Sequence, residues 1–182
     1  CLQEVQRDAF EGVLMPRLGA AGYAGLYKQK TREDMGVAGK VDGCALFWRK
    51  AKFRLSEHYE VEFNEGVWSA MRAARRMSEG EEREILSRML KDNVAQLAVL
   101  QVVSPDPRGG APCICVANTH LYSNPSAPDV KLWQCHALIQ EVESLVNAPP
   151  PARPLPVMLC GDFNSSPDSA VYERAARSLL AR

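Results

Sequence analysis

The chain has 182 residues, and its 22 lysines and arginines balance 22 aspartates and glutamates, so the formal net charge is zero. This length suits one domain, and a composition of 46% hydrophobic and 24% charged residues argues against a disordered or fibrous chain. No segment reaches the roughly 18–20 apolar residues that a membrane-spanning helix needs, which excludes a membrane span. Zero net charge removes bulk attraction to a polyanion but leaves a local anion site open.

The first half of the chain predicts one helix and two strands. Apolar residues recur at helical spacing between Gln6 and Leu18, and Pro16 within that stretch predicts a kink or a break. The polar stretch 28–40 contains two glycines and predicts a loop. Short strands are expected at 44–48 and 53–63, the second because apolar and acidic residues alternate along part of it.

The second half predicts buried strands that alternate with helices. Residues 68–91 are rich in charge, and a capping box at 78–81 precedes an apolar stripe. Apolar runs at 94–103, 113–118 and 157–160 predict three core strands. Residues 129–146 place their apolar side chains on one face and predict a helix, so the pattern as a whole indicates a layered α/β domain.

The cysteines predict reduced, buried thiols in an intracellular protein. None forms a Cys-x-x-Cys pair and four lie in apolar runs, which disfavours disulfides and a zinc site. The six are Cys1, Cys44, Cys113, Cys115, Cys135 and Cys160. The chain begins with Cys1 instead of Met, and residues 1–5 are typical of the end of a buried strand, so we expect a fragment of a larger domain.

Three polar residues each follow a hydrophobic strand: Glu4, His120 and Asp162. Ligands of α/β sheets bind at strand ends, and burial of such groups is costly unless a partner compensates it. The three residues therefore predict one shared site, where carboxylate and amide oxygens would suit Mg²⁺ better than Zn²⁺. The structural alternatives are a solvated edge carboxylate for Glu4, a hydrogen-bonded core histidine for His120, and turn or cap residues for Asp162 and Asn164.

Three motifs resemble those of the endonuclease/exonuclease/phosphatase superfamily, whose fold is similar to deoxyribonuclease I. They are Leu-Gln-Glu-Val at 2–5, Asn-Thr-His-Leu at 118–121 and Gly-Asp-Phe-Asn-Ser at 161–165. Further stretches at 40–47, 61–64, 91–95, 129–134 and 167–169 are similar to carbon-catabolite-repressor-type poly(A) deadenylases. The resemblance covers nearly the whole chain. It implies that residues 1–182 are a partial catalytic domain, a layered α/β sandwich that is incomplete at both ends.

The resemblance also implies a role for each polar residue of the motifs. Glu4 would bind the catalytic Mg²⁺, which Mn²⁺ could replace, and would contact the substrate. His120 would contact the scissile phosphate and stabilise the charge of the transition state. Asp162 would help to activate the attacking water, and Asn164 would help to hold phosphate or metal. Phosphodiester hydrolysis needs charge neutralisation, a base for water and aimed hydrogen-bond donors, so these roles suit it.

Two further positions resemble substrate contacts of the deadenylases. Pro125 matches a proline that packs against adenine, with a turn residue as its alternative, and Asn93 matches an amide near the phosphate, with a strand-entry cap as its alternative. Ser-Asn at 123–124 departs from the Trp-Asp that the family often has there. An Asn-bearing strand expected upstream of residue 2 and a Ser-Asp-His motif expected downstream lie outside the 182 residues.

A modest basic group precedes the first predicted strand after the loop: Lys28, Lys30, Arg32 and Lys40. Such groups can meet RNA phosphates, but no family motif matches this one, so no site is assigned to it.

The resemblance implies a Mg²⁺-dependent 3′→5′ exoribonuclease that shortens mRNA poly(A) tails. RNA would be its substrate, subunits of a deadenylase complex its partners, and the cytoplasm its compartment, with the nucleus as a second location. One alternative is a related phosphodiesterase for 2′,5′-oligoadenylate or a phosphorylated nicotinamide nucleotide. A second alternative is a catalytically dead fragment that acts as an interaction module.

Overall fold

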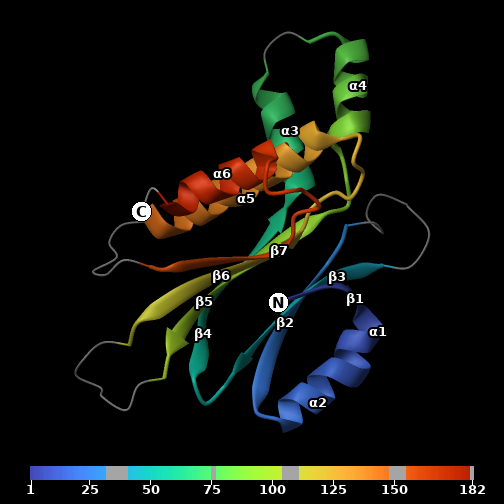
Figure 1. Cartoon of the computed structure of the whole chain (residues 1–182). Coiled ribbons are helices and arrows are strands. Elements are labelled where there is room, and N and C mark those ends of the chain that lie inside the picture. The colour runs from blue at the N-terminus through green and yellow to red at the C-terminus, as the bar shows by residue number, and fades with distance from the viewer. Residues whose placement is uncertain (32–40, 75–76, 104–110, 148–154, 181–182) are drawn as a thin grey trace.

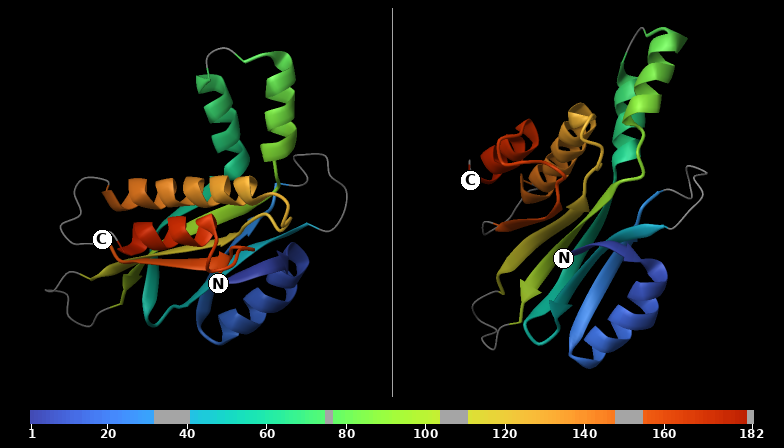
Figure 2. Two further views of the ribbon diagram at one scale, coloured as in Figure 1. Left: turned by 45° about the horizontal axis from the view of Figure 1, so that its top comes forward. Right: turned by 45° about the vertical axis from the view of Figure 1, so that its right-hand side comes forward.

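The computed structural model describes residues 1–31, 41–74, 77–103, 111–147 and 155–180. Two β-sheets stack face to face, and helices cover the outer face of each sheet (Figures 1 and 2). The predicted layered α/β architecture is therefore confirmed. No described helix is both long and apolar enough to span a membrane.

The first sheet is antiparallel and has the strand order β1-β3-β2. Its strands are β1 (Leu2–Gln6), β2 (Tyr23–Gln29) and β3 (Asp42–Arg49). Three consecutive helical segments cover its outer face, namely α1 (Arg7–Ala9), the π-helical η1 (Phe10–Leu14) and α2 (Met15–Ala20). Phe10 stacks on Tyr27 with ring centroids 5.0 Å apart, which anchors this helical stretch to the sheet.

The predicted kink in the first helix is present as a π-helical turn. The N–H of Met15 bonds to the C=O of Phe10, five residues back, and Pro16 follows at the start of α2. Proline has no N–H to continue the α-helical pattern, so a wide turn just before it is the expected local solution.

The second sheet has the order β4-β5-β6-β7, antiparallel except for the parallel pair β6–β7. Its strands are β4 (Phe53–Glu62), β5 (Val94–Val102), β6 (Cys113–His120) and β7 (Val157–Asp162). The helices α5 (Pro128–Asn147) and α6 (Ala170–Leu180) lie on its outer face (Figure 1). Because α5 connects β6 to β7, their carboxyl ends meet at one edge of the sheet.

Alternation along β6 decides which side chains face the neighbouring sheet. Ala117 packs with residues of α5, whereas Val116 packs with Leu46 and Trp48 of β3. Side chains two residues apart share one face of a strand, so Asn118 and His120 point to the same side as Val116, toward the first sheet. The central strands of the second sheet are buried on both faces, as predicted for 94–103.

The charged stretch 68–91 contains two helices. These are α3 (Phe63–Ala73) and α4 (Glu79–Met89), which together form a hairpin that projects from the sandwich (Figure 2). The predicted capping box is present: Ser78 N–H donates to the Glu81 carboxylate at 2.9 Å, and Ser78 Oγ accepts from Glu81 N–H at 3.3 Å. The apolar stripe of α4 is not buried, because the hairpin stands away from the core and no residue of α4 is fully covered.

Two strands that we predicted as buried lie at sheet edges. Val5 is the one buried residue of β1, and β7 has none, with Met158 50% exposed. Each strand pairs on one side only within the described residues, so its other side receives no cover from the sheet. The apolar composition of both segments correctly predicted strands, but it did not predict that these strands lie at the sheet edges.

The sequence analysis missed β2 and extended the following loop too far. Lys28 and Gln29 belong to β2, whereas 32–40 of the predicted loop lies outside the described residues. Gly25 interrupts the run of residues that favour a strand, which obscured β2 in the sequence. A glycine suits this position because a Cβ would lie 2.6 Å from the ring of Phe47.

All six cysteines are free, as predicted, but their burial varies. Cys44, Cys115 and Cys135 are buried, and burial raises the pKa of Cys44 to about 12 and that of Cys135 to about 11. Cys1 is exposed because it precedes an edge strand, and Cys113 and Cys160 are half-buried. The prediction of buried thiols therefore holds for three of the six.

Candidate active site

Glu4 lies inside β1, at a β-bulge. The pairing of β1 with β3 shifts between Leu2 and Val5, so β1 carries one extra residue there. Glu4 has a positive φ of 56°, a conformation that L-residues other than glycine, asparagine and aspartate rarely adopt. Its side chain is exposed, which corrects the prediction of a buried carboxylate beyond a strand end.

Asn118 connects the bulge to the second sheet. Its Oδ1 accepts from Gln3 Nε2 at 2.7 Å, and its Nδ2 donates to the C=O of Leu2 at 3.2 Å and to the C=O of Ala45 at 2.9 Å. The strand β1 also contacts β6 and β7. The segment that carries Glu4 therefore lies against the strands that carry His120 and Asp162.

His120 and Asp162 are register partners at the carboxyl ends of the parallel strands β6 and β7. His120 Nε2 lies 4.0 Å from Asp162 Oδ2, and the side chains are 7% and 54% exposed, respectively. His120 Nδ1 is buried without a hydrogen-bond partner in the described part of the chain. Of the three residues predicted as buried, only His120 is, because Asp162 ends an edge strand and faces solvent.

The loop after β7 is held in a tight turn by Asp162 and Asn164. Asp162 Oδ1 accepts from the backbone N–H of Asn164 at 2.8 Å, and Asn164 Nδ2 donates to the C=O of Leu121 at 2.9 Å. Asn164 has φ of 46°, and the buried Lys131 donates from Nζ to its C=O at 2.8 Å. Asp162 and Asn164 thus act as turn residues, which leaves Asp162 Oδ2 as the oxygen nearest to His120.

Asn93 holds the backbone of His120 in place. Its Nδ2 donates to the C=O of His120 at 2.9 Å, and its Oδ1 accepts from Gln134 Nε2 at 3.2 Å. Gln134 Oε1 in turn accepts from the N–H of Tyr122 at 2.9 Å. Asn93 and Gln134 are almost fully buried, so both amides position the backbone around His120.

Pro125 is exposed in the turn between β6 and α5. The turn is closed by a bond from Ala127 N–H to the C=O of Asn124 at 3.2 Å, and Ser126 N–H donates to Asn124 Oδ1 at 2.9 Å. Pro125 occupies the second position of this turn, where its fixed φ is suitable. Its ring is solvent-accessible, and its role toward a base stays a prediction.

Two residues of the basic group are paired with carboxylates. Lys28 Nζ contacts Glu60 at 2.9 Å and also Glu62, and Lys30 Nζ lies 2.8 Å from Asp42. Both ammonium groups are largely buried in these pairs and are not presented to a phosphate. Arg32 and Lys40 lie outside the described residues.

The donor set suits Mg²⁺ better than Zn²⁺. In the described part of the chain no group of three or more His, Cys, Asp or Glu side chains is placed to hold a metal ion. A structural zinc site needs four such protein ligands, whereas Mg²⁺ keeps several waters and binds through one or two carboxylates. Glu4 supplies an exposed carboxylate on a strand that contacts β6 and β7, and such an oxygen donor fits a largely hydrated Mg²⁺.

The sequence analysis missed three buried polar residues that support the site. They are Asn118, Lys131 and Gln134, each less than 10% exposed. Lys131 and Gln134 lie on the buried face of α5, at positions where helical periodicity calls for apolar residues. A polar residue inside an apolar stripe was the signal that could have found them.

The whole chain, residues 1–182, matches the model of the Endonuclease/Exonuclease/phosphatase family. The chain belongs to this family.

Carbon catabolite repressor protein 4 homolog 2 of Arabidopsis thaliana is 40% identical over 177 residues, which cover 94% of this chain and 28% of that protein. The CCR4-Not complex 3′-5′-exoribonuclease subunit Ccr4 of Yarrowia lipolytica is 34% identical over 196 residues, which cover 94% of the chain and 26% of that protein. The chain thus spans little more than a quarter of the length of these relatives.

Among solved structures, ANGEL2, a 2′,3′-cyclic phosphatase in complex with adenosine-2′,3′-vanadate, superposes with a TM-score of 0.70. It is 34% identical, and the match covers 95% of this chain and 41% of that one. The likeness to ANGEL2 confirms the predicted family fold. The two relatives described above confirm the predicted similarity to carbon-catabolite-repressor-type proteins.

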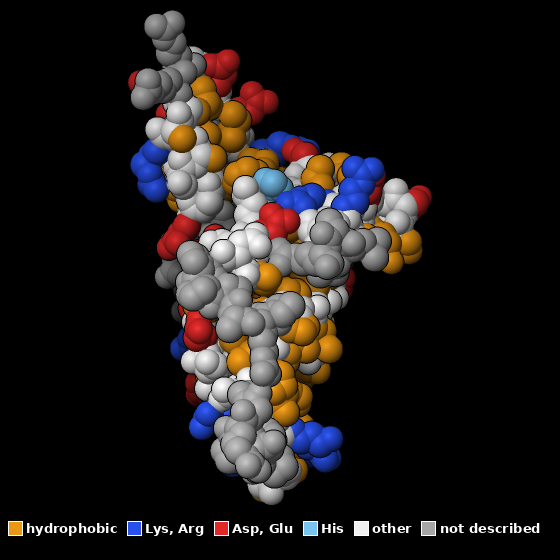
Figure 3. Space-filling view, turned by 90° about the vertical axis from the view of Figure 1, so that its left-hand side faces the viewer, with side chains coloured by type: hydrophobic (Ala, Val, Ile, Leu, Met, Phe, Trp, Pro, Cys, Tyr) orange, Lys and Arg blue, Asp and Glu red, His pale blue; other side chains and the backbone are white. Residues whose placement is uncertain are grey.

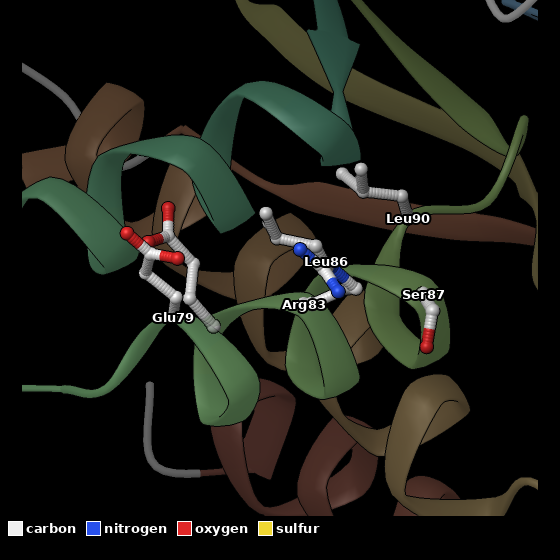
Figure 4. Close-up of a pocket in the computed structure, with 6 residues that line it drawn as sticks. Glu79, Arg83, Leu86, Ser87 and Leu90 are labelled. Atoms are coloured by element: carbon white, nitrogen blue, oxygen red, sulfur yellow. The ribbon is translucent and has the colours of Figure 1, made fainter.

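A surface hollow of about 600 Å³ on α4 is separate from these residues. It is lined by Glu79, Glu82, Arg83, Leu86, Ser87 and Leu90 (Figure 4). None of the motif residues lines it, so it forms no part of the candidate active site.

Proposed function

We propose that the full-length protein is a Mg²⁺-dependent 3′→5′ exoribonuclease that shortens poly(A) tails. The observation that carries the proposal is the register pairing of His120 with Asp162, 4.0 Å apart from Nε2 to Oδ2, beside the strand that bears Glu4. A buried imidazole next to a solvent-facing carboxylate offers a hydrogen-bond donor and a proton acceptor on one small surface. Phosphodiester hydrolysis requires both.

In this proposal Asp162 accepts a proton from the attacking water at Oδ2. Its other oxygen is occupied by the N–H of Asn164, so the turn fixes the direction in which Oδ2 faces. The water oxygen bonds to phosphorus as the bond from phosphorus to the leaving ribose oxygen breaks. His120 donates from Nε2 to a non-bridging phosphate oxygen, where negative charge develops.

Glu4 is the residue that would hold Mg²⁺, and the bound ion would neutralise phosphate charge. The bulge turns the Glu4 side chain outward to solvent, where an ion can keep most of its water. Asn93 holds the His120 backbone in place through its 2.9 Å bond and needs no contact with substrate to do so.

The choice of poly(A) rests on the resemblance to the deadenylases and on the relatives that carry Ccr4 names. The Yarrowia relative, named a 3′-5′-exoribonuclease subunit of the CCR4-Not complex, supports RNA as the ligand and subunits of such a complex as partners. The cytoplasm as the site of action rests on the resemblance to the deadenylases. Residues 1–182 form part of one catalytic domain in this proposal.

The test is a substrate panel with the full-length protein. We expect stepwise shortening of 3′,5′-linked A-tracts with Mg²⁺ or Mn²⁺, slower cleavage of mixed RNA, and loss of both activities on chelation. Glu4→Ala should abolish cleavage while the circular dichroism spectrum stays unchanged. Equal rates on all RNAs would overturn the preference for poly(A), and undiminished turnover by Glu4→Ala would remove Glu4 from the site.

A second candidate is hydrolysis of a 2′,3′-cyclic phosphate at an RNA end. The likeness to ANGEL2 favours it, because ANGEL2 is a 2′,3′-cyclic phosphatase and its structure in complex with adenosine-2′,3′-vanadate superposes with a TM-score of 0.70. The same panel should include an oligonucleotide with a 2′,3′-cyclic phosphate and a 2′,5′-linked oligoadenylate. Preference for either one would replace the deadenylase proposal, and absence of turnover on every substrate would favour an interaction module.

A further inference from the structure

We propose that Asn118 is a positioning residue that holds the Glu4 carboxylate in place relative to His120. The inference rests on the proposed function, because it gives Glu4 the part of a metal ligand. It concerns a residue of the Asn-Thr-His-Leu motif to which the resemblance assigns no role.

Asn118 is 0% exposed, and its side-chain amide makes three hydrogen bonds that use both of its N–H donors. Two of them reach β1, one from the side chain of Gln3 at 2.7 Å and one to the C=O of Leu2 at 3.2 Å. The third reaches the C=O of Ala45 in β3 at 2.9 Å, beside the same bulge. A single side chain of the second sheet therefore forms hydrogen bonds to both strands that pair at the bulge, β1 and β3.

The two residues of β1 that bond to Asn118, Leu2 and Gln3, come directly before Glu4. On the other flank, Tyr27 Oη donates to the C=O of Val5 at 2.9 Å. The bulge is thus fixed on both sides of Glu4, from β6 before it and from β2 after it. A positive φ of 56° is unfavourable for a glutamate and persists only where the surroundings determine it.

His120 lies two residues after Asn118 on the same face of β6, roughly 7 Å farther along the strand. The distance between the Glu4 bulge and His120 is therefore set by one short stretch of a buried strand. If Glu4 binds the ion and His120 contacts the phosphate, Asn118 sets the spacing between ion and phosphate donor. This gives the buried amide of the motif a role in the site.

The experiment measures Mn²⁺ affinity in the full-length protein without RNA, together with hydrogen exchange of residues 2–6. Asn118→Leu keeps the branched shape and the number of side-chain heavy atoms, adds no charge and removes all three bonds. We expect about 10- to 100-fold weaker Mn²⁺ binding, the range typical for loss of a residue that orients a metal ligand, and faster exchange in β1. Gln3→Met removes one bond at a half-buried position and should shift both readouts in the same direction by less.

Gln96→Met is the matched control. Gln96 is the register partner of Asn118, is equally buried, and also joins the two sheets, through a 3.0 Å bond from Nε2 to the C=O of Cys44. It makes no hydrogen bond to β1 among the described residues. This variant should therefore leave Mn²⁺ affinity and β1 exchange unchanged.

Glu4→Gln separates this inference from the proposed function. If Glu4→Gln weakens Mn²⁺ binding but Asn118→Leu and Gln3→Met do not, Asn118 has no positioning role and the inference alone falls. If Glu4→Gln leaves binding unchanged, Glu4 is not a ligand, and both proposals fall. If Asn118→Leu does not fold, the comparison of Gln3→Met with Gln96→Met tests the inference instead. Equal effects of these two variants on Mn²⁺ affinity and on exchange in β1 would refute it.

Discussion

In the proposed mechanism, the single residue Asp162 combines two tasks. One carboxylate oxygen closes the turn to Asn164, and the other lies 4.0 Å from His120 Nε2. A purely structural turn residue would use the first oxygen only. The orientation of the second is what distinguishes a proton acceptor from a cap, and it allows the two roles to be separated by substitution.

We expect Asp162→Asn to lower turnover by about 10²- to 10⁴-fold with little change in RNA affinity, because the amide keeps an oxygen for Asn164 but accepts no proton. Single-turnover rates and RNA dissociation constants measure the two effects separately. Asp168→Asn is the control, since Asp168 is an acid of the same loop that bonds to Ser166. Equal loss of rate in both variants would show that loop charge, not the position of Asp162, matters.

At the scale of elements, the parallel pair β6–β7 determines the geometry of the site. Gly161 of β7 is the register partner of Thr119 of β6, has φ of 147°, and would place a Cβ 2.2 Å from the C=O oxygen of Thr119. No L-residue with a side chain can take this position without moving the strands apart. The glycine before Asp162 is therefore required by the strand pairing as well as by the turn.

Gly161→Ala should destabilise the protein by roughly 1–3 kcal/mol, because it forces a strained backbone and a clash at one position. Urea unfolding followed by circular dichroism measures the change. Gly80→Ala in the first turn of α4 is the control: nothing lies within 4 Å of its Cβ, and alanine in a helix should add about 0.5–1 kcal/mol. A neutral Gly161→Ala would contradict the close approach of β6 and β7.

At the scale of the whole molecule, ion pairs join the two sheets at the edge opposite to the site. Lys28 of β2 reaches Glu60 and Glu62 of β4 across the sheet interface. Burial alone would lower the pKa of Lys28, but hydrogen bonds to Glu62 and Glu60 outweigh burial and raise it. The charged form of Lys28 is thus favoured by folding.

A group whose pKa is raised in the folded state stabilises the fold at pH values below its unfolded-state pKa. This stabilisation is lost as the pH rises through its folded-state pKa. We therefore expect the free energy of unfolding to fall as the pH rises above 10.5, the ordinary value for lysine. Lys28→Met should remove this part of the decline, whereas Lys30→Met, which leaves the Lys28 pairs intact, should keep it. Urea unfolding across that pH range tests the difference, and identical profiles for wild type and Lys28→Met would refute it.

The outer surface carries exposed apolar side chains. Hydrophobic residues are gathered on the side of the molecule shown in Figure 3. Among the described residues, Met158 of β7 and Tyr172 of α6 are 50% and 55% exposed. An edge strand with apolar side chains and free backbone groups is a template for pairing with another chain.

The 182-residue chain on its own should self-associate through β7, and Met158→Lys should raise the monomer fraction because an edge lysine opposes strand pairing. Light scattering after size-exclusion chromatography measures the fraction. Ile85→Lys on the projecting hairpin is the control, since Ile85 is also exposed, at 39%, but lies far from any sheet edge. A larger effect of Ile85→Lys would assign self-association to the hairpin.

The sequence by itself determined the elements whose side chains follow a local rule. The apolar run of β5, the one-sided helix α5 and the capping box at Ser78 were predicted with nearly the bounds that the structure has. The polar motif residues could also be chosen in advance, because an imidazole or carboxylate at the end of an apolar run is conspicuous.

Only the tertiary structure decided how these parts meet. Gln3 and Asn118 are 115 residues apart, and their bond exists because one sheet stacks on the other. The exposure of β1 and β7, the bulge at Glu4 and the pairing of Lys28 depend on which strands become neighbours. Periodicity along the chain records how each side chain relates to its nearest sequence neighbours, whereas strand order and sheet stacking arise from contacts between distant segments, which no local pattern contains.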